Sequence, residues 1–169
     1  METRGLFSSI EEIKKKGFLG FVSKAELFAD CTAIPKVKGV YLILYAGLKE
    51  PAFLEVGCGG FFKGKNPNVS IAELKFKWVP KSQVIYIGKA GGSSSSATLH
   101  SRLKQYFAFG QGKAVGHYGG RYIWQLEKPR ELIVCWKPTP DEEPRAAESS
   151  LMAEFVTQFG KKPFANLKD

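Results

Sequence analysis

Cysteine and histidine are both scarce in this chain of 169 residues. There are three cysteines and two histidines, and Cys31, Cys58 and Cys135 lie far apart in the sequence. An odd number of isolated thiols argues against a disulfide framework, and no pair has the close spacing of a zinc site. With only His100 and His117 available, a histidine-rich metal centre is not expected either.

Long apolar runs are also missing. No stretch approaches the roughly 18 apolar residues that a membrane-spanning helix needs, and the first residues, with Glu2, Glu11 and Glu12, lack the apolar centre of a signal peptide. Hydrophobic residues make up 44% and charged residues 24% of the chain, which is ordinary for a folded protein and argues against disorder. We therefore expect a folded cytoplasmic protein with no membrane partner.

Acidic residues are nearly absent from the middle third of the chain. Lysine and arginine number 25 against 16 acids, which gives a net charge of +9. From Phe61 to Arg121 there are ten basic residues and a single acid, Glu73, so this stretch accounts for the whole excess. Such an uneven distribution indicates a polyanionic partner such as nucleic acid, although a solvated basic surface that keeps the protein soluble is the simpler alternative.

Hydrophobic periodicity, with glycine and proline as breaks, predicts a mixture of helices and strands. Ser9 and Ser23 each stand three residues before a glutamate, which is the spacing of a helix-capping box. The predicted helices cover residues 10–16, 24–30, 99–107 and 145–159. The predicted strands cover residues 39–46 and 83–88, followed by a strand pair at 121–126 and 131–136. Residues 71–79 fit either a helix or an edge strand.

The order of these elements predicts an α/β fold of the α+β kind, in which a small and mainly antiparallel central sheet is flanked by helices. Residues 1–38 are expected to form an N-terminal helical extension, and residues 39–169 the main domain. The segment at about residues 47–82 is rich in glycine, proline, lysine and asparagine, which is typical of an insertion rather than of core.

A near match to a nucleotide-binding loop occurs within this insertion. Gly59, Gly64 and Lys65 have the P-loop spacing, but Asn66 stands where the loop needs a hydroxyl group for magnesium. Pro67 then obstructs the helix whose N-terminus would hold the phosphates. Nucleotide hydrolysis is therefore not expected.

A series of short motifs runs in order along the chain. They are Gly39-Val40-Tyr41, then Tyr86-Ile87-Gly88 with Lys89 directly after it, Arg102 and Tyr106 four residues apart, a glutamate in the last predicted helix, and Pro163-Phe164-Ala165-Asn166. In this order the set resembles the GIY-YIG nuclease family, over most of the chain but with long unmatched insertions. The resemblance implies metal-dependent hydrolysis of phosphodiester bonds, with Mg²⁺ or Mn²⁺ as cofactor, on a small sheet flanked by helices.

The resemblance implies that Tyr41 is the general base, with Tyr86 and Lys89 positioning or tuning it. Tyrosine is a poor base because its ordinary pKa is about 10. A neighbouring ammonium group such as Lys89, or a metal-bound water that hands over its proton, would favour the phenolate. The alternative is that both tyrosines only pack the sheet and that Lys89 is a solvated charge.

Three further residues have supporting roles under the same resemblance. Arg102 offers a planar fork for phosphate oxygens, and Tyr106, one helical turn later, is expected to line the same pocket. Asn166 is expected to support the active site. Each also has a structural alternative: a solvated charge for Arg102, core packing for Tyr106, and a turn after Pro163 for Asn166.

Two glutamates of the last predicted helix compete for the role of metal ligand. Glu154 stands at the compact distance from the C-terminal motif that many family members show, whereas Glu148 is followed by apolar residues three and four positions later. At about 100° per residue, Glu148 falls inside the apolar stripe formed by Leu151, Met152 and Phe155, and Glu154 falls outside it. An inward carboxylate needs a partner, which Mg²⁺ supplies with a single protein ligand, so Glu148 is favoured; a buried salt bridge is the alternative.

Basic residues outside the motifs are candidates for nucleic-acid binding, because contacts with backbone phosphates position a protein without reading the sequence. The candidates are Lys63, Lys65, Lys104, Lys113, His117 and Arg121. His117 could equally bind a nearby carbonyl group, and Arg121 could simply end a strand.

Together these features predict a metal-dependent endonuclease that hydrolyses DNA phosphodiester bonds, as a standalone enzyme of the restriction, defence or repair type. Cutting both strands would need a homodimer or two successive nicks, and the sequence does not decide between them. Two alternatives stay open: a non-catalytic nucleic-acid-binding module that kept the fold, and a nuclease that acts on RNA.

Overall fold

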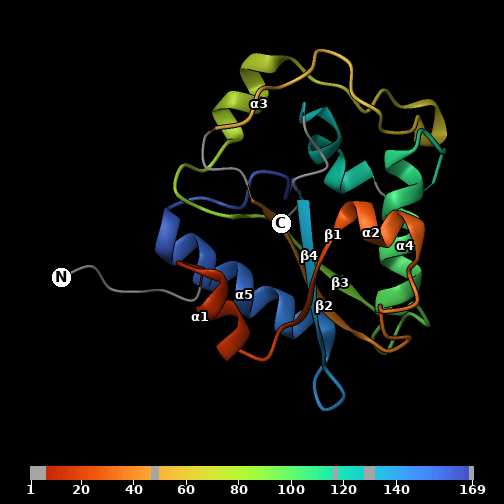
Figure 1. The fold of residues 1–169 in the computed structure, drawn as a ribbon, viewed down its shortest axis with the longest axis vertical. Helices are drawn as coiled ribbons and strands as arrows, with labels where there is room; N and C mark the ends of the chain where they lie inside the picture. Colours follow the sequence, from red (N-terminus) through yellow and green to blue (C-terminus); the bar gives the residue numbers. More distant parts are fainter. Residues whose placement is uncertain (1–6, 47–49, 116–117, 128–131, 168–169) are drawn as a thin grey trace.

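The computed structural model describes residues 7–46, 50–115, 118–127 and 132–167. Its centre, within these residues, is a four-stranded sheet made of β1 (Leu19–Ser23), β2 (Gly39–Tyr45), β3 (Val84–Ala90) and β4 (Leu132–Pro138). The strands follow the order β1-β4-β2-β3, and each neighbouring pair is antiparallel. With its flanking helices the sheet makes an α+β fold, as the sequence predicts (Figure 1).

Helices connect and cover these strands. They are α1 (Ile10–Lys15), α2 (Lys24–Ala29), α3 (Ile71–Lys77), α4 (Leu99–Gly110) and α5 (Pro144–Phe159), with the 3-10 segments η1 (Phe62–Gly64) and η2 (Tyr118–Gln125). Hydroxyl side chains cap the starts of α1, α2 and α3, where Ser9, Ser23 and Ser70 each accept a hydrogen bond from the backbone three residues later. Thr98 and Ser101 form a reciprocal capping box at the start of α4.

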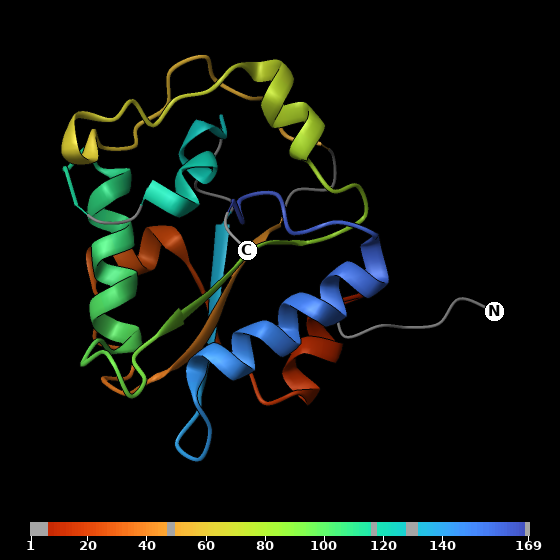
Figure 2. The ribbon, with the colours of Figure 1, turned by 180° about the vertical axis from the view of Figure 1, so that it is seen from behind.

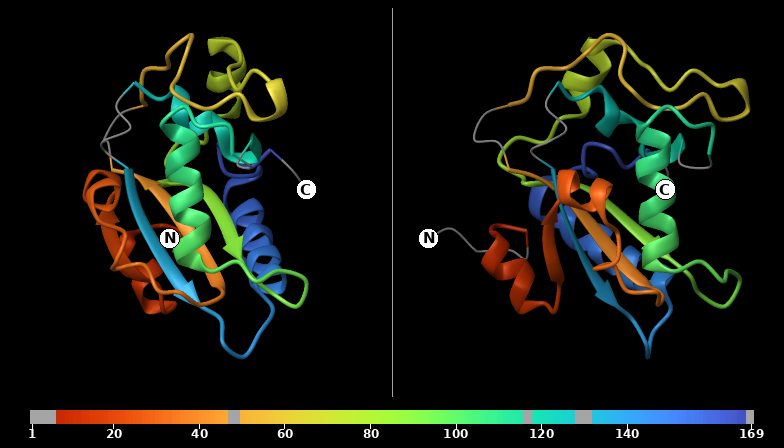
Figure 3. Two further views of the ribbon diagram at one scale, coloured as in Figure 1. Left: turned by 90° about the vertical axis from the view of Figure 1, so that its right-hand side faces the viewer. Right: turned by 45° about the vertical axis from the view of Figure 1, so that its right-hand side comes forward.

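The sheet separates two hydrophobic cores. We call the side covered by α2, α4 and η2 the α4 face, and the side covered by α1 and α5 the α5 face (Figures 2 and 3). The period of two along β2 divides its buried side chains between them: Tyr41 and Ile43 lie on the α4 face, whereas Val40, Leu42 and Leu44 lie on the α5 face.

The chain returns after α5 to the outer edge of β3. The backbone N–H of Ala165 donates to the carbonyl oxygen of Ile85 at 2.9 Å. The Asn166 side chain then pairs with both backbone groups of Ile87: its oxygen accepts from the N–H at 2.9 Å, and its nitrogen donates to the carbonyl at 2.8 Å. This short segment therefore binds part of an edge that has no further strand in the described sheet.

The inserted segment forms a separate layer near the end of α4, and it contains η1 and α3 (Figure 1). The buried side chain of Gln125, in η2, fastens this layer to the rest of the fold. Its nitrogen donates to the carbonyl oxygens of Leu54 at 3.0 Å and Val69 at 2.9 Å, and its oxygen accepts from the N–H of Val69 at 3.0 Å. Residues 71–77 form a helix, which decides between the two forms that the sequence allows.

Two segments differ from the sequence prediction. Leu19–Ser23 forms the edge strand β1, although the sequence predicts no element there. The register shifts between Gly20 and Val22, and Leu19 is exposed, so this segment lacks the regular alternation from which strands are predicted. Residues 121–126 are predicted to pair with residues 131–136, but residues 121–125 belong to η2. Both edges of β4 are already occupied by β1 and β2, so no edge is left for another strand.

The N-terminal residues take part in the same sheet as the main domain, through β1. A domain boundary after residue 38 stays a prediction. Among the described residues, no helix is long and apolar enough to cross a membrane.

Candidate active site

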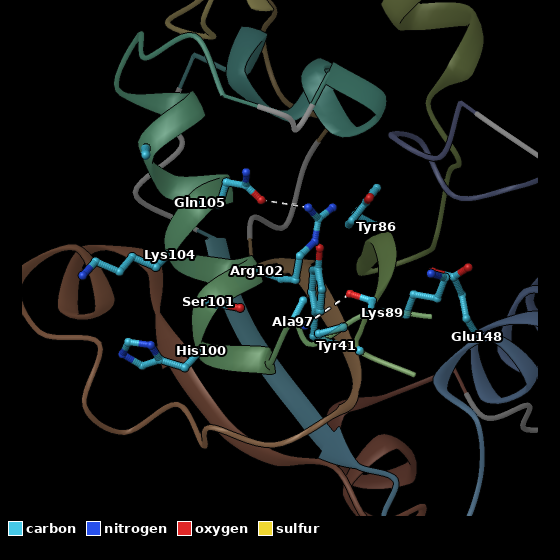
Figure 4. Close-up of a pocket in the computed structure, with 14 residues that line it drawn as sticks. Tyr41, Tyr86, Lys89, Ala97, His100, Ser101, Arg102, Lys104, Gln105 and Glu148 are labelled. Atoms are coloured by element: carbon cyan, nitrogen blue, oxygen red, sulfur yellow. Dashed lines mark hydrogen bonds between the residues drawn. The ribbon is translucent and has the colours of Figure 1, made fainter. Parts of the chain in front are cut away.

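A cavity of about 850 Å³ opens at the β3 edge of the sheet, between α4 and α5. Figure 4 shows the side chains that line it. Tyr41, Tyr86, Lys89, Arg102 and Glu148 all contribute to its wall. Five of the residues that the motifs single out, from two strands and two helices, therefore come together in one place.

The register between β2 and β3 brings the two tyrosines together. Tyr41 is opposite Gly88, and Ile43 is opposite Tyr86, so both rings project from the α4 face as diagonal neighbours. Their ring centroids are 6.0 Å apart. Gly88 leaves room for this arrangement, because a methyl group there would overlap the Tyr41 ring. Gly88 of the second motif therefore leaves the space that the Tyr41 ring of the first motif occupies.

Burial controls the acidity of both phenols. Desolvation raises the pKa of Tyr41 well above its usual value of 10.0, and the nearby Tyr86 raises it further, whereas the positive charge of Arg102 opposes the shift. Desolvation also raises the pKa of Tyr86, with Glu148 adding to the shift, and the hydrogen bond from Tyr41 lowers it. In the free protein both groups are therefore neutral phenols at physiological pH.

The positive charge of Arg102 opposes the rise of the Tyr41 pKa. Lys89, the residue that the sequence predicts for this role, lines the same cavity, but it is paired with Val40, whose side chain lies on the α5 face. Arg102 approaches from α4 on the same face as the tyrosines, and its Nη1 donates to Oε1 of Gln105 at 2.8 Å (Figure 4). This bond holds one side of the guanidinium group and directs its fork over the cavity.

Glu148 enters the cavity from the first half of α5. Its carboxylate is half-buried, and desolvation raises its pKa above the ordinary 4.5, while Lys89 and Arg145 oppose the shift. Figure 4 shows the Lys89 side chain directed toward it. Within the described part of the chain, Glu148 has no hydrogen bond and no ion pair closer than 4 Å. The ion pair found there joins Lys15 to Glu12. A half-buried carboxylate in this state has capacity for a cation.

The donor set of the cavity fits Mg²⁺ or Mn²⁺ better than zinc. No group of three or more histidine, cysteine, aspartate or glutamate side chains within the described ranges could hold an ion. Zinc would need such a set, whereas Mg²⁺ usually keeps several waters and takes one or two carboxylates together with phosphate oxygens. Glu148 can supply one such oxygen.

Glu154, the alternative ligand, lies outside this cavity. It is exposed and lines a smaller cavity of about 290 Å³, together with Lys16 and Lys137. The helical phase of α5 therefore separates the two glutamates as the sequence argument expects. Of the two, Glu148 is the one that shares a cavity with Tyr41 and Arg102.

Tyr106 does not line the cavity, contrary to the expectation from the sequence. It is fully buried, its ring stacks on that of Tyr86 with centroids 5.5 Å apart, and its hydroxyl donates to the carbonyl oxygen of Gly120. Although Tyr106 is four residues from Arg102, its side chain lies in the core of the α4 face and not in the cavity. Tyr106 therefore packs against the ring of Tyr86. Asn166 does not line this cavity either, and its side chain is hydrogen-bonded to both backbone groups of Ile87.

The basic residues proposed for nucleic-acid binding are scattered. Lys104 lines the cavity. Lys63, Lys65 and Lys113 are exposed but do not line it, and the Arg121 guanidinium group lies over the ring of Tyr122, 5.4 Å from its centroid. His117 falls outside the described residues.

Several residues that line the cavity were not predicted from the sequence, and two of them have long polar side chains on α4. His100 and Gln105 both belong to the wall of the cavity. Their spacing gives the signal that could have found them: His100 stands four residues before Lys104, and Gln105 three residues after Arg102, so each can share a helical face with a candidate residue.

No family model, curated protein or solved structure matches the chain.

Proposed function

We propose that the protein is a metal-dependent endonuclease of the GIY-YIG type that hydrolyses DNA phosphodiester bonds. One observation carries the proposal. Tyr41, Tyr86, Lys89, Arg102 and Glu148 are spread over more than a hundred positions of the chain, yet they line a single open cavity. Phenol, guanidinium, ammonium and carboxylate groups together suit the hydrolysis of a phosphodiester, in which a water loses a proton and a crowded anionic centre develops.

Each residue has a distinct task in this proposal. Tyr41 takes the proton of the attacking water at its hydroxyl oxygen, which requires the phenolate form. Burial keeps Tyr41 neutral in the free protein, so Tyr41 must first release its own proton to solvent, and the positive charge of Arg102 favours this loss. Arg102 binds two oxygens of the scissile phosphate, and Lys89 adds a second positive charge. Glu148 would hold Mg²⁺ or Mn²⁺, which when bound would stabilise the negative charge on the phosphate and on the leaving oxygen.

The wider setting of the enzyme stays a prediction. We expect an enzyme of the restriction, defence or repair type that works in the cytoplasm. A homodimer would allow both strands of DNA to be cut in one encounter.

A plasmid-nicking assay tests the proposal. Supercoiled DNA should be nicked with Mg²⁺ and not with EDTA, and Arg102→Ala should reduce the rate by about a hundred- to a thousandfold. Lys16→Ala is a matched control, because this substitution also removes one positive charge. Lys16 lines the smaller cavity, together with Glu154. This variant should keep the parent rate.

The same assay separates the alternatives. Cutting of RNA but not of DNA would change the proposed substrate to RNA and leave the proposed hydrolysis of phosphodiester bonds in place. Salt-sensitive binding of nucleic acid with no cutting, in Mg²⁺ or Mn²⁺, would refute the enzyme and leave a binding module.

A further inference from the structure

A second cavity adjoins the candidate active site on the α5 face. Its volume is about 590 Å³, and it shares Tyr86 and Glu148 with the first cavity. The two hollows therefore meet at these two side chains and together wrap around the edge of β3. The outer wall of the second cavity comes from α5, and its inner wall from β3 and the segment that follows Pro163.

The wall of the second cavity combines cations with apolar side chains. Arg145 and Lys162 contribute the positive charge, and Met152, Val156 and Leu167 the apolar surface. Arg145 lies close enough to Glu148 to oppose the rise of its pKa. A cation close to the catalytic carboxylate, followed by an apolar wall, suits a phosphate joined to a sugar and base.

We propose that the second cavity binds the nucleotide next to the scissile phosphate. The neighbouring phosphate lies on Arg145, and the sugar lies against the apolar side chains of α5. The substrate strand thus passes around the edge of β3, from the α4 face to the α5 face, and the bond that is cut lies at the turning point. This inference deepens the proposed nuclease function and rests on it.

The proposal predicts a dependence on substrate length. A DNA oligonucleotide occupies both cavities, whereas bis(4-nitrophenyl) phosphate has one phosphate and no flanking nucleotide. Arg145→Ala should lower the ratio of kcat/KM for the oligonucleotide to kcat/KM for the small diester by about tenfold, the effect of one lost charge-assisted hydrogen bond. Ala153→Trp should lower the same ratio, because a bulky ring at this exposed position of α5 fills the second cavity.

Lys16→Ala is the control for long-range charge effects. It changes the net charge by the same amount as Arg145→Ala, but it lies at the smaller cavity beside Glu154. It should leave the ratio unchanged. If Arg145→Ala and Ala153→Trp also leave the ratio unchanged while the parent cuts DNA, the second cavity is no nucleotide site and the nuclease proposal survives.

A binding measurement keeps the test decisive if the parent cuts nothing. The affinity of a short fluorescent oligonucleotide is measured by anisotropy in EDTA for the parent, for Arg145→Ala, for Ala153→Trp and for the control Lys16→Ala. A drop of about tenfold for Arg145→Ala, with Lys16→Ala unchanged, supports nucleotide binding in the second cavity even when catalysis is absent. Equal affinities of all four proteins, with no cutting, overturn both proposals together.

Discussion

The two faces of the sheet bury different kinds of side chain. The core of the α4 face contains tyrosines and tryptophans, among them Tyr41, Tyr106 and Trp124. The described core of the α5 face consists of aliphatic residues and phenylalanines, with Cys135 as its sulfur-bearing member. One face therefore carries hydroxyl groups inside a packed core, and the other is almost purely hydrocarbon.

The cavity lies at an edge of the sheet, where residues from both faces can meet. Buried hydroxyl groups need partners, and the α4 face provides them, as in the bond from Tyr106 to the carbonyl of Gly120. In the core of the α5 face, burial raises the pKa of the Cys135 thiol to about 12, so the thiol stays neutral. Glu148, an acid of α5, can join the phenols of the α4 face at the rim of the sheet, where β3 has open space beside it.

The largest expected effect separates the two acids of α5. Glu148→Gln should reduce DNA cleavage by about a thousandfold, because it removes the charge proposed to hold the metal ion while keeping the shape of the side chain. Glu154→Gln makes the same chemical change outside the cavity and should leave the rate near that of the parent. Single-turnover kinetics in Mg²⁺ measure both, and the reverse ranking would assign the metal to the other acid.

A second prediction concerns the phenols of the α4 face. Tyr41→Phe should slow cleavage by about a hundredfold, since it removes the proposed proton acceptor but keeps the ring. Tyr45→Phe is the matched change on the same strand and in the same core, away from the cavity, and should have little effect on the rate. A Tyr41→Phe enzyme as fast as the parent would show that the hydroxyl group has only a packing role.

A smaller effect should appear in stability when Gly88 gains a side chain. Gly88→Ala should lower the free energy of unfolding by about 1–3 kcal/mol, because the new methyl group overlaps the Tyr41 ring. In a Tyr41→Ala background the same substitution should cost much less, since the ring is gone. Denaturant unfolding of the four proteins measures this coupling, and equal costs in both backgrounds would mean that the two residues do not press on each other.

The smallest effect is a pH dependence of stability that originates at Glu148. Its folded pKa is raised, so the ionised carboxylate costs stability at neutral pH, and this cost disappears as the pH falls through the folded pKa. Glu148→Gln should therefore have a slightly higher Tm than the parent at pH 7 in EDTA, and the difference should shrink toward pH 4. A difference that grows on acidification would contradict the raised pKa.

Local patterns in the sequence predict the α+β class, the strands β2, β3 and β4 and most helices, because these depend on periodicity and capping within a few residues. The helical phase of residues 145–159 also distinguishes Glu148 from Glu154, since it depends on spacing alone. Whether residues 121–126 form a strand depends instead on which strands flank β4. One of these is β1, which is far away in the sequence. The error on Tyr106 has the same origin, since its direction depends on packing against Tyr86 and Gly120.

The pairing of Asn166 with Ile87 has a consequence beyond the cavity. An open sheet edge can recruit a strand from another molecule and so start self-association. One amide group and the N–H of Ala165 together occupy outward-facing backbone groups of Ile85 and Ile87, where such a strand would dock. Clipping the chain after Gly160 would remove this shield, and the shortened protein should form aggregates that the intact protein does not.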